Sequence, residues 1–329
     1  MPAVSIIVPN YNHGRFLEER LESIFSQTYQ DFEVILLDDC STDNSLEILK
    51  RYAAHPKVRE LRVNEHNSGS PFKQWRQGLA LAGGEYIWIA ESDDYAGKDF
   101  LATLVPLLQS NPRLGMAYCH SMVVGENSEI IGEYSNYSVS CPERWKHDFT
   151  NSGTDEISSY LLRINTIPNA SAAVVRKAAF ADMVVPDNLK TMGDWYIWIK
   201  LLSRRDIAYT AQPLNYFRQS TQSTRQHCSF AGKQERIFQA LELTGQLARE
   251  GILNAANHRK AILCRLDSWA YEYCIAGSPG VSLFAVLKHF PALKKYAPHL
   301  ILYYLRHRGS RIRRQESGVR SQNRTWKSE

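Results

Sequence analysis

Residues 4–12 have the sequence VSIIVPNYN, in which an apolar run gives way to polar loop residues. The run Val4–Val8 is short and continuous, which is typical of a strand buried inside a sheet. It is followed by Phe16–Phe25, where apolar residues recur at helical spacing. A buried strand that leads into an amphipathic helix predicts the start of a βαβ unit.

The alternation of strand and helix patterns continues beyond this first unit. Strand patterns occur at Phe32–Leu37, Val58–Val63 and Tyr86–Ala90, and helix patterns occur at Asp43–Tyr52 and Phe72–Leu81. Strands separated by helices favour parallel pairing. The sequence therefore predicts an α/β fold, Rossmann-like, with a mainly parallel sheet flanked by helices.

The second half of the pattern is less regular. We expect a helix from Asp99 to about Ser110, strands at Met116–Val124, Ala170–Val175 and Ile207–Phe217, and a helix at Trp195–Leu202. The polar stretch Gly125–Thr154 shows no regular pattern, and a connection of this length inside a compact domain predicts a functional lid. From Phe230 onward only helical periods occur.

Three parts of the chain follow from these patterns. We expect an α/β domain at residues 1–228, a helical C-terminal region at 229–305 and a basic, flexible tail at 306–329. The tail has eight Arg and Lys residues against two Glu residues, so it accounts for the net charge of +5. Such a tail is commonly solvated. Because apolar segments precede it, peripheral contact with an anionic membrane through the C-terminal region is the alternative.

Composition excludes several classes of protein. With 44% apolar and 22% charged residues, the chain is neither disordered nor fibrous. The six cysteines lie at wide, irregular spacings without a C-x-x-C pair, so neither zinc nor a redox dithiol is indicated. The amino terminus lacks a signal-peptide pattern, and no apolar run reaches the roughly 18 residues of a membrane-spanning helix. We therefore expect a cytoplasmic protein, with peripheral contact at the inner membrane surface as the alternative for its C-terminal region.

Polar and acidic residues follow three of the predicted strands, at Pro9–Asn12, Asp38–Ser41 and Glu91–Asp94. In an open α/β sheet, ligands bind beyond the carboxyl ends of the strands. Five carboxylates gathered there would repel one another, so we expect a divalent cation among them, and oxygen ligands favour Mg²⁺ or Mn²⁺. Such an ion is commonly shared with phosphates, which predicts a nucleoside diphosphate. The alternative is that Asp38 and Asp43 only cap the following helix.

Three segments together resemble the family 2 glycosyltransferases of the GT-A fold. They are residues 4–12, Leu37–Asp43 and Gly84–Asp94, in this order and at this spacing, and the resemblance covers about residues 3 to 225. It implies an inverting enzyme that moves a sugar from a nucleoside-diphosphate sugar to a hydroxyl of a glycan or lipid-linked saccharide. It also implies Mn²⁺ or Mg²⁺ as cofactor and a place in bacterial surface polysaccharide synthesis.

The resemblance also assigns roles to residues of the three segments. The nucleotide would contact Pro9, Tyr11, Asn12, Asp38, Asp39 and Asp93. Asp94 would hold the metal ion. The family usually has Asp at the position of Glu91, and the longer side chain of Glu91 could reach the ion through water.

Gly193–Trp198 resembles the segment whose acidic residue deprotonates the acceptor hydroxyl in inverting members of the family. This makes Asp194 the candidate catalytic base. A sugar hydroxyl is a poor nucleophile at neutral pH, and a positioned carboxylate contributes about 10²- to 10⁴-fold. The alternative is that Asp194 caps a helix beginning at Trp195.

Further candidates for contact with phosphate or substrate are Lys73, Trp195, Arg218 and Arg225. Lys73 follows a turn that resembles the family's N-x-G turn, with a solvated helix face as the alternative. Trp195 could stack on a sugar ring, with core packing as the alternative. Phe217–Ser220 matches the family's aromatic-Arg-x-His motif with serine in place of histidine, which leaves the two arginines for the leaving phosphate.

Other functions fit the sequence less well. A nucleotide-binding oxidoreductase would also have βαβ units, but the loop after the first strand lacks G-x-G-x-x-G. A catalytically inactive nucleotide-sugar binding module remains an alternative, because Glu91 and Ser220 depart from the family pattern. A nucleic-acid binder would rest on the basic tail alone, so we expect no nucleic-acid partner.

Overall fold

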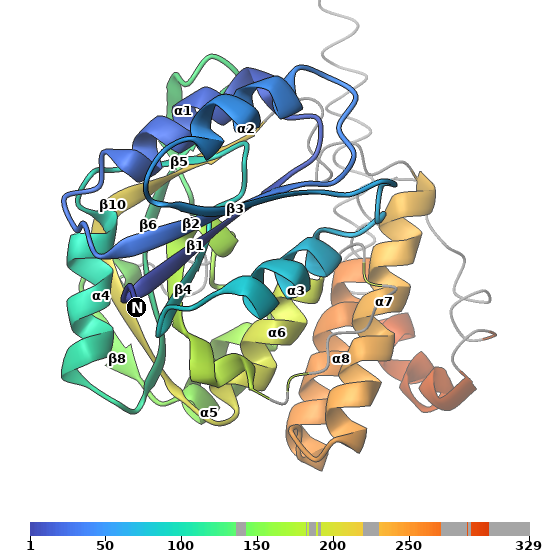
Figure 1. Ribbon diagram of the computed structural model, residues 1–329. Coiled ribbons are helices and arrows are strands. Elements are labelled where there is room, and N and C mark those ends of the chain that lie inside the picture. The colour runs from blue at the N-terminus through green and yellow to red at the C-terminus, as the bar shows by residue number, and fades with distance from the viewer. Residues whose placement is uncertain are drawn as a thin grey trace, which may run out of the picture. The chain divides into compact units, whose positions relative to one another are not determined.

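The structure is a computed structural model that describes residues 1–135, 143–181, 183, 189, 192–219, 230–270, 288 and 291–302. The chain divides into two compact units, Met1–Ser223 and Thr224–Glu329. The first unit is an α/β structure, and the described part of the second is helical (Figure 1).

The first unit is built on one sheet with the strand order β3-β2-β1-β4-β9-β6-β10-β5. In chain order its strands are β1 (Val4–Asn10), β2 (Phe32–Asp38), β3 (Val58–Val63), β4 (Tyr86–Ile89), β5 (Tyr95–Ala96), β6 (Leu114–Val124), β7 (Ile130–Glu133), β8 (Phe149–Asn151), β9 (Ala173–Arg176) and β10 (Asp206–Arg218). Strands β3, β2, β1 and β4 run parallel, as do β6 and β10. Strand β9 runs antiparallel between β4 and β6. The predicted mainly parallel α/β fold is confirmed.

Helices cover both faces of this sheet (Figure 1). They are α1 (Gly14–Phe25), α2 (Ser45–Ala53), α3 (Pro71–Leu81), α4 (Phe100–Ser110), α5 (Gly153–Glu156) and α6 (Gly193–Leu202). Successive strand residues point to opposite faces. Ile6 and Val8 belong to the core that α1, α2 and α4 complete. Ile7 points to α3, where a methyl group on Gly78 would lie only 2.3 Å from its side chain. The glycine therefore lets α3 pack close to β1.

The predicted irregular stretch from Gly125 to Thr154 is partly regular. Strand β7 forms a hairpin with β6, and β8 pairs with β10. A short helical turn occurs within this stretch at Arg144–Lys146, and two more follow it at Ile157–Leu161 and Lys177–Phe180. Residues 136–142 lie outside the described residues. The strand predicted from Ala170 begins later, at Ala173, because Ala170–Ala172 form a 3₁₀ turn that Asn169 caps by accepting the N–H of Ala172.

The second unit contains the helices α7 (Phe230–Arg249) and α8 (Ala255–Ala270), which pack against each other through buried apolar residues such as Leu247 and Leu266. A 3₁₀ segment follows at Pro291–Tyr296. Among the residues that the structure describes, no helix combines the length and the low charge that a membrane crossing needs. Most of the apolar segment before the tail, and the tail itself, lie outside the described residues.

Candidate functional site

Asp38, at the carboxyl end of β2, holds two loops together. One carboxylate oxygen accepts the side-chain amide of Asn10 at 2.9 Å and the hydroxyl of Ser41 at 2.7 Å. The other accepts the N–H of Ser41 at 2.9 Å. Asp38 is buried, so its visible role is to tie the end of β1 to the loop after β2.

Asp43 has the helix-capping role that was the alternative for the acidic residues of this loop. Its two carboxylate oxygens accept the N–H of Ser45 at 2.9 Å and of Gly14 at 2.8 Å, at the starts of α2 and α1. Burial acts to raise the pKa of Asp43, but these hydrogen bonds outweigh it and lower the pKa. Asp38 makes no such contact with either helix.

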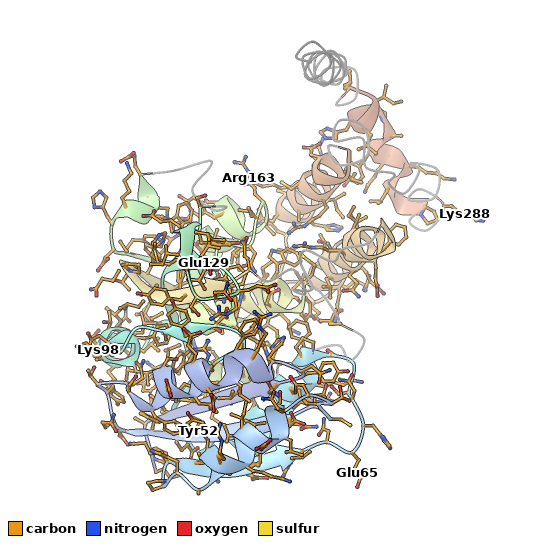
Figure 2. All side chains as sticks on the ribbon, turned by 90° about the horizontal axis from the view of Figure 1, so that it is seen from above. Tyr52, Glu65, Lys98, Glu129, Arg163 and Lys288 are labelled. Carbon is orange, nitrogen blue, oxygen red and sulfur yellow. The ribbon has the colours of Figure 1, made fainter. Side chains whose placement is uncertain are left out.

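Asp39 is fixed from the side of α3. One of its oxygens accepts from Asn64 at 2.7 Å, from the N–H of Ser68 at 2.9 Å and from Gln74 at 2.8 Å. The other accepts the hydroxyl of Ser68 at 2.8 Å. These partners belong to α3 and to the loop before it, where Glu65 projects (Figure 2). Asp39, which was predicted to contact the nucleotide, is therefore held in a fixed position.

The end of β1 and the loop after it contain both buried and exposed residues. Pro9 is buried, while Tyr11 is 45% exposed. The side-chain oxygen of Asn12 accepts the N–H of Thr42 at 2.7 Å, and Asn12 has a left-handed backbone with φ 55°. Asparagine tolerates this conformation better than most residues. The arrangement leaves the ring of Tyr11 exposed in the loop after β1.

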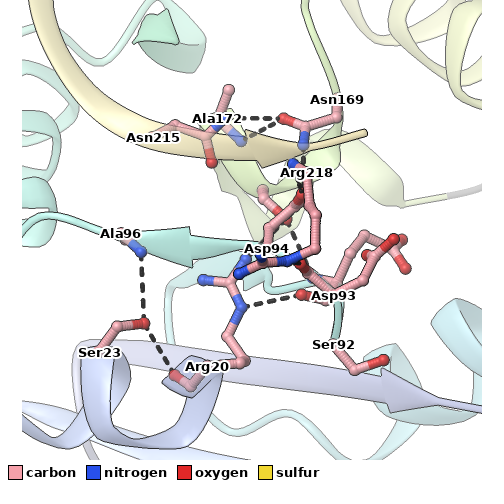
Figure 3. Close-up of polar contacts among 12 residues, drawn as sticks. Arg20, Ser23, Ser92, Asp93, Asp94, Ala96, Asn169, Ala172, Asn215 and Arg218 are labelled. Carbon is pink, nitrogen blue, oxygen red and sulfur yellow. Dashed lines mark hydrogen bonds and ion pairs between the residues drawn. The ribbon is translucent and has the colours of Figure 1, made fainter. Parts of the chain in front are cut away.

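Asp94, the predicted metal ligand, has both oxygens committed to internal hydrogen bonds (Figure 3). One oxygen accepts the N–H of Arg218 at 2.9 Å, and the other accepts from Asn169 and Ser171, each at 2.6 Å. The residue is 2% exposed. By contrast Asp93 is partly exposed, and no described residue donates a hydrogen bond to its carboxylate. In this structure the carboxylate of Asp94 is therefore enclosed and that of Asp93 is accessible, and the metal-binding role of Asp94 stays a prediction.

Arg20 supplies positive charge beneath this loop. Its guanidinium is fully buried, donates to the carbonyl of Glu91 at 2.8 Å and to Ser171 at 2.9 Å, and lies 4.0 Å from Asp94. Burial lowers the pKa of Arg20 to about 10, against the opposing effect of Asp94 and its neighbours. Arg20 therefore supplies part of the positive charge that the neighbouring carboxylates require.

The loop Glu91–Asp94, called the acidic loop below, nevertheless has too little positive charge nearby to balance its carboxylates. Burial, and then repulsion from Asp93, raise the pKa of Glu91 to about 8 and that of Asp94 to about 7. Glu91 accepts the indole N–H of Trp75 at 2.9 Å and so is directed toward α3. These two carboxyls with raised pKa values, next to the open carboxylate of Asp93, would gain from a further cation.

A divalent ion fits this site only if it needs few protein ligands. Among the described residues, no three His, Cys, Asp or Glu side chains are grouped so as to hold a metal. Mg²⁺ is commonly bound by one or two carboxylates together with water and substrate phosphates. The open carboxylate of Asp93 satisfies this requirement, with Glu91 available through water.

Arg218, which was predicted to contact the leaving phosphate, is buried in this structure and links several loops. It is 1% exposed. Its guanidinium donates to the carbonyl of Asp93 at 2.7 Å, to the carbonyl of Gly125 at 2.6 Å and to Ser128 at 3.0 Å. Glu129 marks the hairpin that these contacts hold (Figure 2). Arg218 therefore fastens the acidic loop to the β6–β7 hairpin.

The remaining candidates for contact with phosphate or substrate are Trp195, Lys73 and Arg225. Trp195 is fully buried and donates its indole N–H to the carbonyl of Leu161 at 2.7 Å, which agrees with the core-packing alternative. Lys73 donates to the carbonyl of Ser68 at 3.0 Å and stays partly exposed. Arg225 lies outside the described residues.

Asp194 lies in the first turn of α6 and does not cap it. The helix begins at Gly193, after Met192 with φ 59°, and no side chain caps its start. Asp194 accepts the side-chain amide of Asn165 at 2.9 Å. Gly193 faces α3, where a methyl group on it would lie 2.5 Å from the ring of Phe72. The candidate base therefore stands beside the helix that holds Asp39 and Glu91.

A single loop connects the candidate base with the acidic loop. Asn165 contacts Asp194, and Asn169, four residues later, contacts Asp94 at 2.6 Å. Sequence analysis assigned no contact within the site to either asparagine, to Ser171 or to Arg20. For Arg20 a signal existed, because it lies on the same helical face as the apolar residues of α1. The loop residues carry no periodic pattern that could have marked them.

Comparison with known proteins identifies the family of the chain. The sequence model of the family described as glycosyl transferase family 2 matches residues 5–183, which is more than half of the chain. The glycosyltransferase GlyG of Streptococcus pneumoniae is 36% identical over 138 residues, covering 42% of this chain and 40% of GlyG. The chain thus spans less than half the length of this relative. The teichuronic acid glycosyltransferase TuaG of Bacillus subtilis, a putative assignment in its own name, is 25% identical over 63% of this chain and 75% of TuaG.

Solved structures show the same fold. Staphylococcus aureus TarS 1-349 in complex with UDP-GlcNAc superposes with a TM-score of 0.65 at 20% identity, covering 89% of this chain and 80% of that one. The mannosyltransferase PcManGT of Pyrobaculum calidifontis, with GDP-Man and Mn²⁺, gives a TM-score of 0.54 at 18% identity and covers all of this chain and 88% of the other. The predicted GT-A fold is confirmed, and the chain belongs to glycosyl transferase family 2.

Proposed function

We propose that this protein is an inverting glycosyltransferase that moves a sugar from a nucleoside-diphosphate sugar to a hydroxyl of a glycan or lipid-linked saccharide in bacterial surface polysaccharide synthesis. One observation carries the proposal: Asn165 and Asn169 contact Asp194 and Asp94 from one loop. Four residues of chain span at most about 14 Å. The candidate base and the acidic loop therefore belong to one site, of a size that suits a sugar and a diphosphate.

Within this site we assign the metal contact to Asp93 instead of Asp94. The Asp93 carboxylate is open, whereas both oxygens of Asp94 accept hydrogen bonds, from Arg218, Asn169 and Ser171. Asp94 and Arg218 then hold the loop in place while Asp93 faces the ligand. A bound Mn²⁺ or Mg²⁺ would neutralise the charge that develops on the leaving diphosphate.

The chemistry of the chain's own residues is a single displacement. The acceptor oxygen bonds to the anomeric carbon as the bond from that carbon to the diphosphate oxygen breaks, and the acceptor proton passes to Asp194. The nucleoside diphosphate leaves with the electron pair, and attack on the opposite face inverts the configuration. Asp39, whose oxygens accept internal hydrogen bonds, shapes the wall beside the nucleoside, and the exposed ring of Tyr11 offers a stacking face.

The names of similar proteins support this class of donor. Solved structures contain TarS in complex with UDP-GlcNAc and PcManGT in complex with GDP-Man and Mn²⁺. GlyG and TuaG are named as glycosyltransferases, the latter of teichuronic acid biosynthesis. These names do not select one sugar, so a panel of donors is the appropriate probe.

The test measures release of nucleoside diphosphate by the full chain from UDP-GlcNAc, UDP-glucose and GDP-mannose, with Mn²⁺ or with EDTA. Metal-dependent release supports the enzyme, while binding without release by any of the three supports the inactive binding module. Asp194→Asn should lower the rate about 10²- to 10⁴-fold and leave nucleotide affinity unchanged. Asp93→Asn should weaken the Mn²⁺ dependence of donor binding.

We also propose peripheral contact of the C-terminal region with anionic membrane. Ile301 and Leu302 are 53% and 54% exposed just before the basic tail. The experiment compares sedimentation of the full chain with neutral vesicles and with phosphatidylglycerol vesicles at low salt. Stronger binding to the anionic vesicles is expected, and equal binding to both would refute the proposal.

A further inference from the structure

The carboxylate of Asp194 has one fixed partner. Asn165 donates its side-chain N–H to one carboxylate oxygen at 2.9 Å, and within the described part of the chain this is the single hydrogen bond to that carboxylate. The other oxygen is open. A base that removes a proton from a hydroxyl needs one such oxygen free and aimed at its target.

The orientation of the Asn165 amide is itself determined. Its oxygen accepts the backbone N–H of Ile167 at 3.3 Å. A backbone N–H can only donate and an ionised carboxylate can only accept, so the amide nitrogen must face Asp194. Reversal of the amide would lose both contacts.

The loop that carries Asn165 is anchored in the core. Thr166 is fully buried and donates to Glu156 at 3.2 Å, and Ile167 is also fully buried. Glu156 has no exposed surface and is paired with Arg144. At its other end the loop donates from Asn169 to Asp94. Asn165 is therefore held at a fixed position relative to the acidic loop.

From these contacts we infer that Asn165 is a positioning residue that orients Asp194, so that its open oxygen faces the acceptor hydroxyl. The inference rests on the proposed function and adds a residue to it. The start of α6 provides little other restraint on the side chain, because no cap bond is made there. A misplacement of about 1 Å in a reacting group can cost about 100-fold in rate.

The experiment uses the full chain and whichever of UDP-GlcNAc, UDP-glucose and GDP-mannose it hydrolyses most quickly with Mn²⁺. Asn165→Ala should lower kcat about 10- to 100-fold, with KM for the donor and the affinity for the nucleoside diphosphate within about twofold of wild type. Asn165→Asp has nearly the same shape but repels Asp194, so it should lower kcat further.

Asn151→Ala is the matched control. Asn151 donates to Glu156 at 2.9 Å and so supports the same anchor without touching Asp194. It should lower the melting temperature at least as much as Asn165→Ala but leave kcat nearly unchanged. A fall in kcat of the same size in both variants would assign a merely structural role to Asn165 and overturn the inference.

A double-mutant cycle isolates the action through Asp194. Glu in place of Asp194 keeps a carboxylate for measurable turnover but moves it by one methylene, away from the amide. In that background Asn165→Ala should change kcat less than threefold, and an undiminished effect would overturn the inference. If Asp194→Asn is as active as wild type, the proposed base fails as well. If it is inactive while Asn165→Ala is unaffected, only the inference fails.

Discussion

Replacing Arg20 by methionine tests the electrostatic design of the acidic loop. Methionine keeps much of the apolar stem but removes the charge and the donors to the Glu91 carbonyl and to Ser171. Hydrogen bonds from a charged group contribute about 1.5–3 kcal/mol each. Removing one member of a buried ion pair costs about 3–5 kcal/mol. Because both figures describe the same contacts, Arg20→Met should lower the free energy of unfolding by about 3–5 kcal/mol.

Arg59→Met provides the matched control. Arg59 lies 3.0 Å from Glu33, but its side chain is 46% exposed. Glu33 would keep its hydrogen bonds from Ser5 and from the N–H of Gly83. Because Arg59 is solvated and Glu33, though buried, keeps these two partners, the pair should contribute little more than an exposed one, about 0–1 kcal/mol. The same substitution is therefore nearly neutral at the surface.

Urea unfolding of both variants measures the difference, with the slope against urea concentration compared to wild type. We expect unchanged slopes and a midpoint that falls much further for Arg20→Met. Two variants within about 1 kcal/mol of each other would refute the reasoning, since burial would then add nothing to the role of Arg20.

Other consequences concern pH, a strained turn and a close backbone contact. The raised pKa values of Glu91 and Asp94 mean that the folded chain holds these protons more tightly than the unfolded chain, so without metal its stability should fall between about pH 4 and pH 8. Melting temperatures in EDTA should show a shallower fall for Glu91→Gln, and identical profiles would contradict this. Cys40 has φ 62°, so Cys40→Gly should stabilise by about 0.5–1 kcal/mol, seen as a higher melting temperature. A methyl group at Gly153 would lie 1.9 Å from the carbonyl oxygen of Leu202, so Gly153→Ala should destabilise by about 3 kcal/mol in urea unfolding.

Local patterns were sufficient to predict the sheet and the loops at its edge. The apolar runs of β1, β2 and β4 are short, continuous and followed by polar residues, and each becomes a buried strand. The rule that ligands bind beyond the carboxyl ends of parallel strands then directed attention to Asp39 and Asp93. Both lie where the rule places them, because strand direction alone determines which end of a strand faces the site.

The different surroundings of Asp93 and Asp94 in the acidic loop could not be predicted in this way. Asp93 and Asp94 are adjacent and chemically identical, and the sequence offers no reason for one to be buried. Burial of Asp94 depends on Asn169, Ser171 and Arg218, which come from distant parts of the chain. The internal contacts of Arg218 could not be predicted for the same reason, since an arginine near a predicted site can stabilise the fold as well as bind a ligand.

The antiparallel strand β9 explains why these distant residues meet. It pairs with β4 so that Val174 lies opposite Trp88, and the two strands run in opposite directions. The residues before β9 must therefore lie at the edge where β4 ends, which places Ser171 beside Glu91, whose N–H donates to it at 3.1 Å. In a mixed sheet the ligand-binding edge thus collects loops that follow parallel strands and loops that precede antiparallel ones. Applied to a sequence, this extension of the rule would have drawn the segment from Asn165 to Ser171 into the candidate site once the direction of β9 was known.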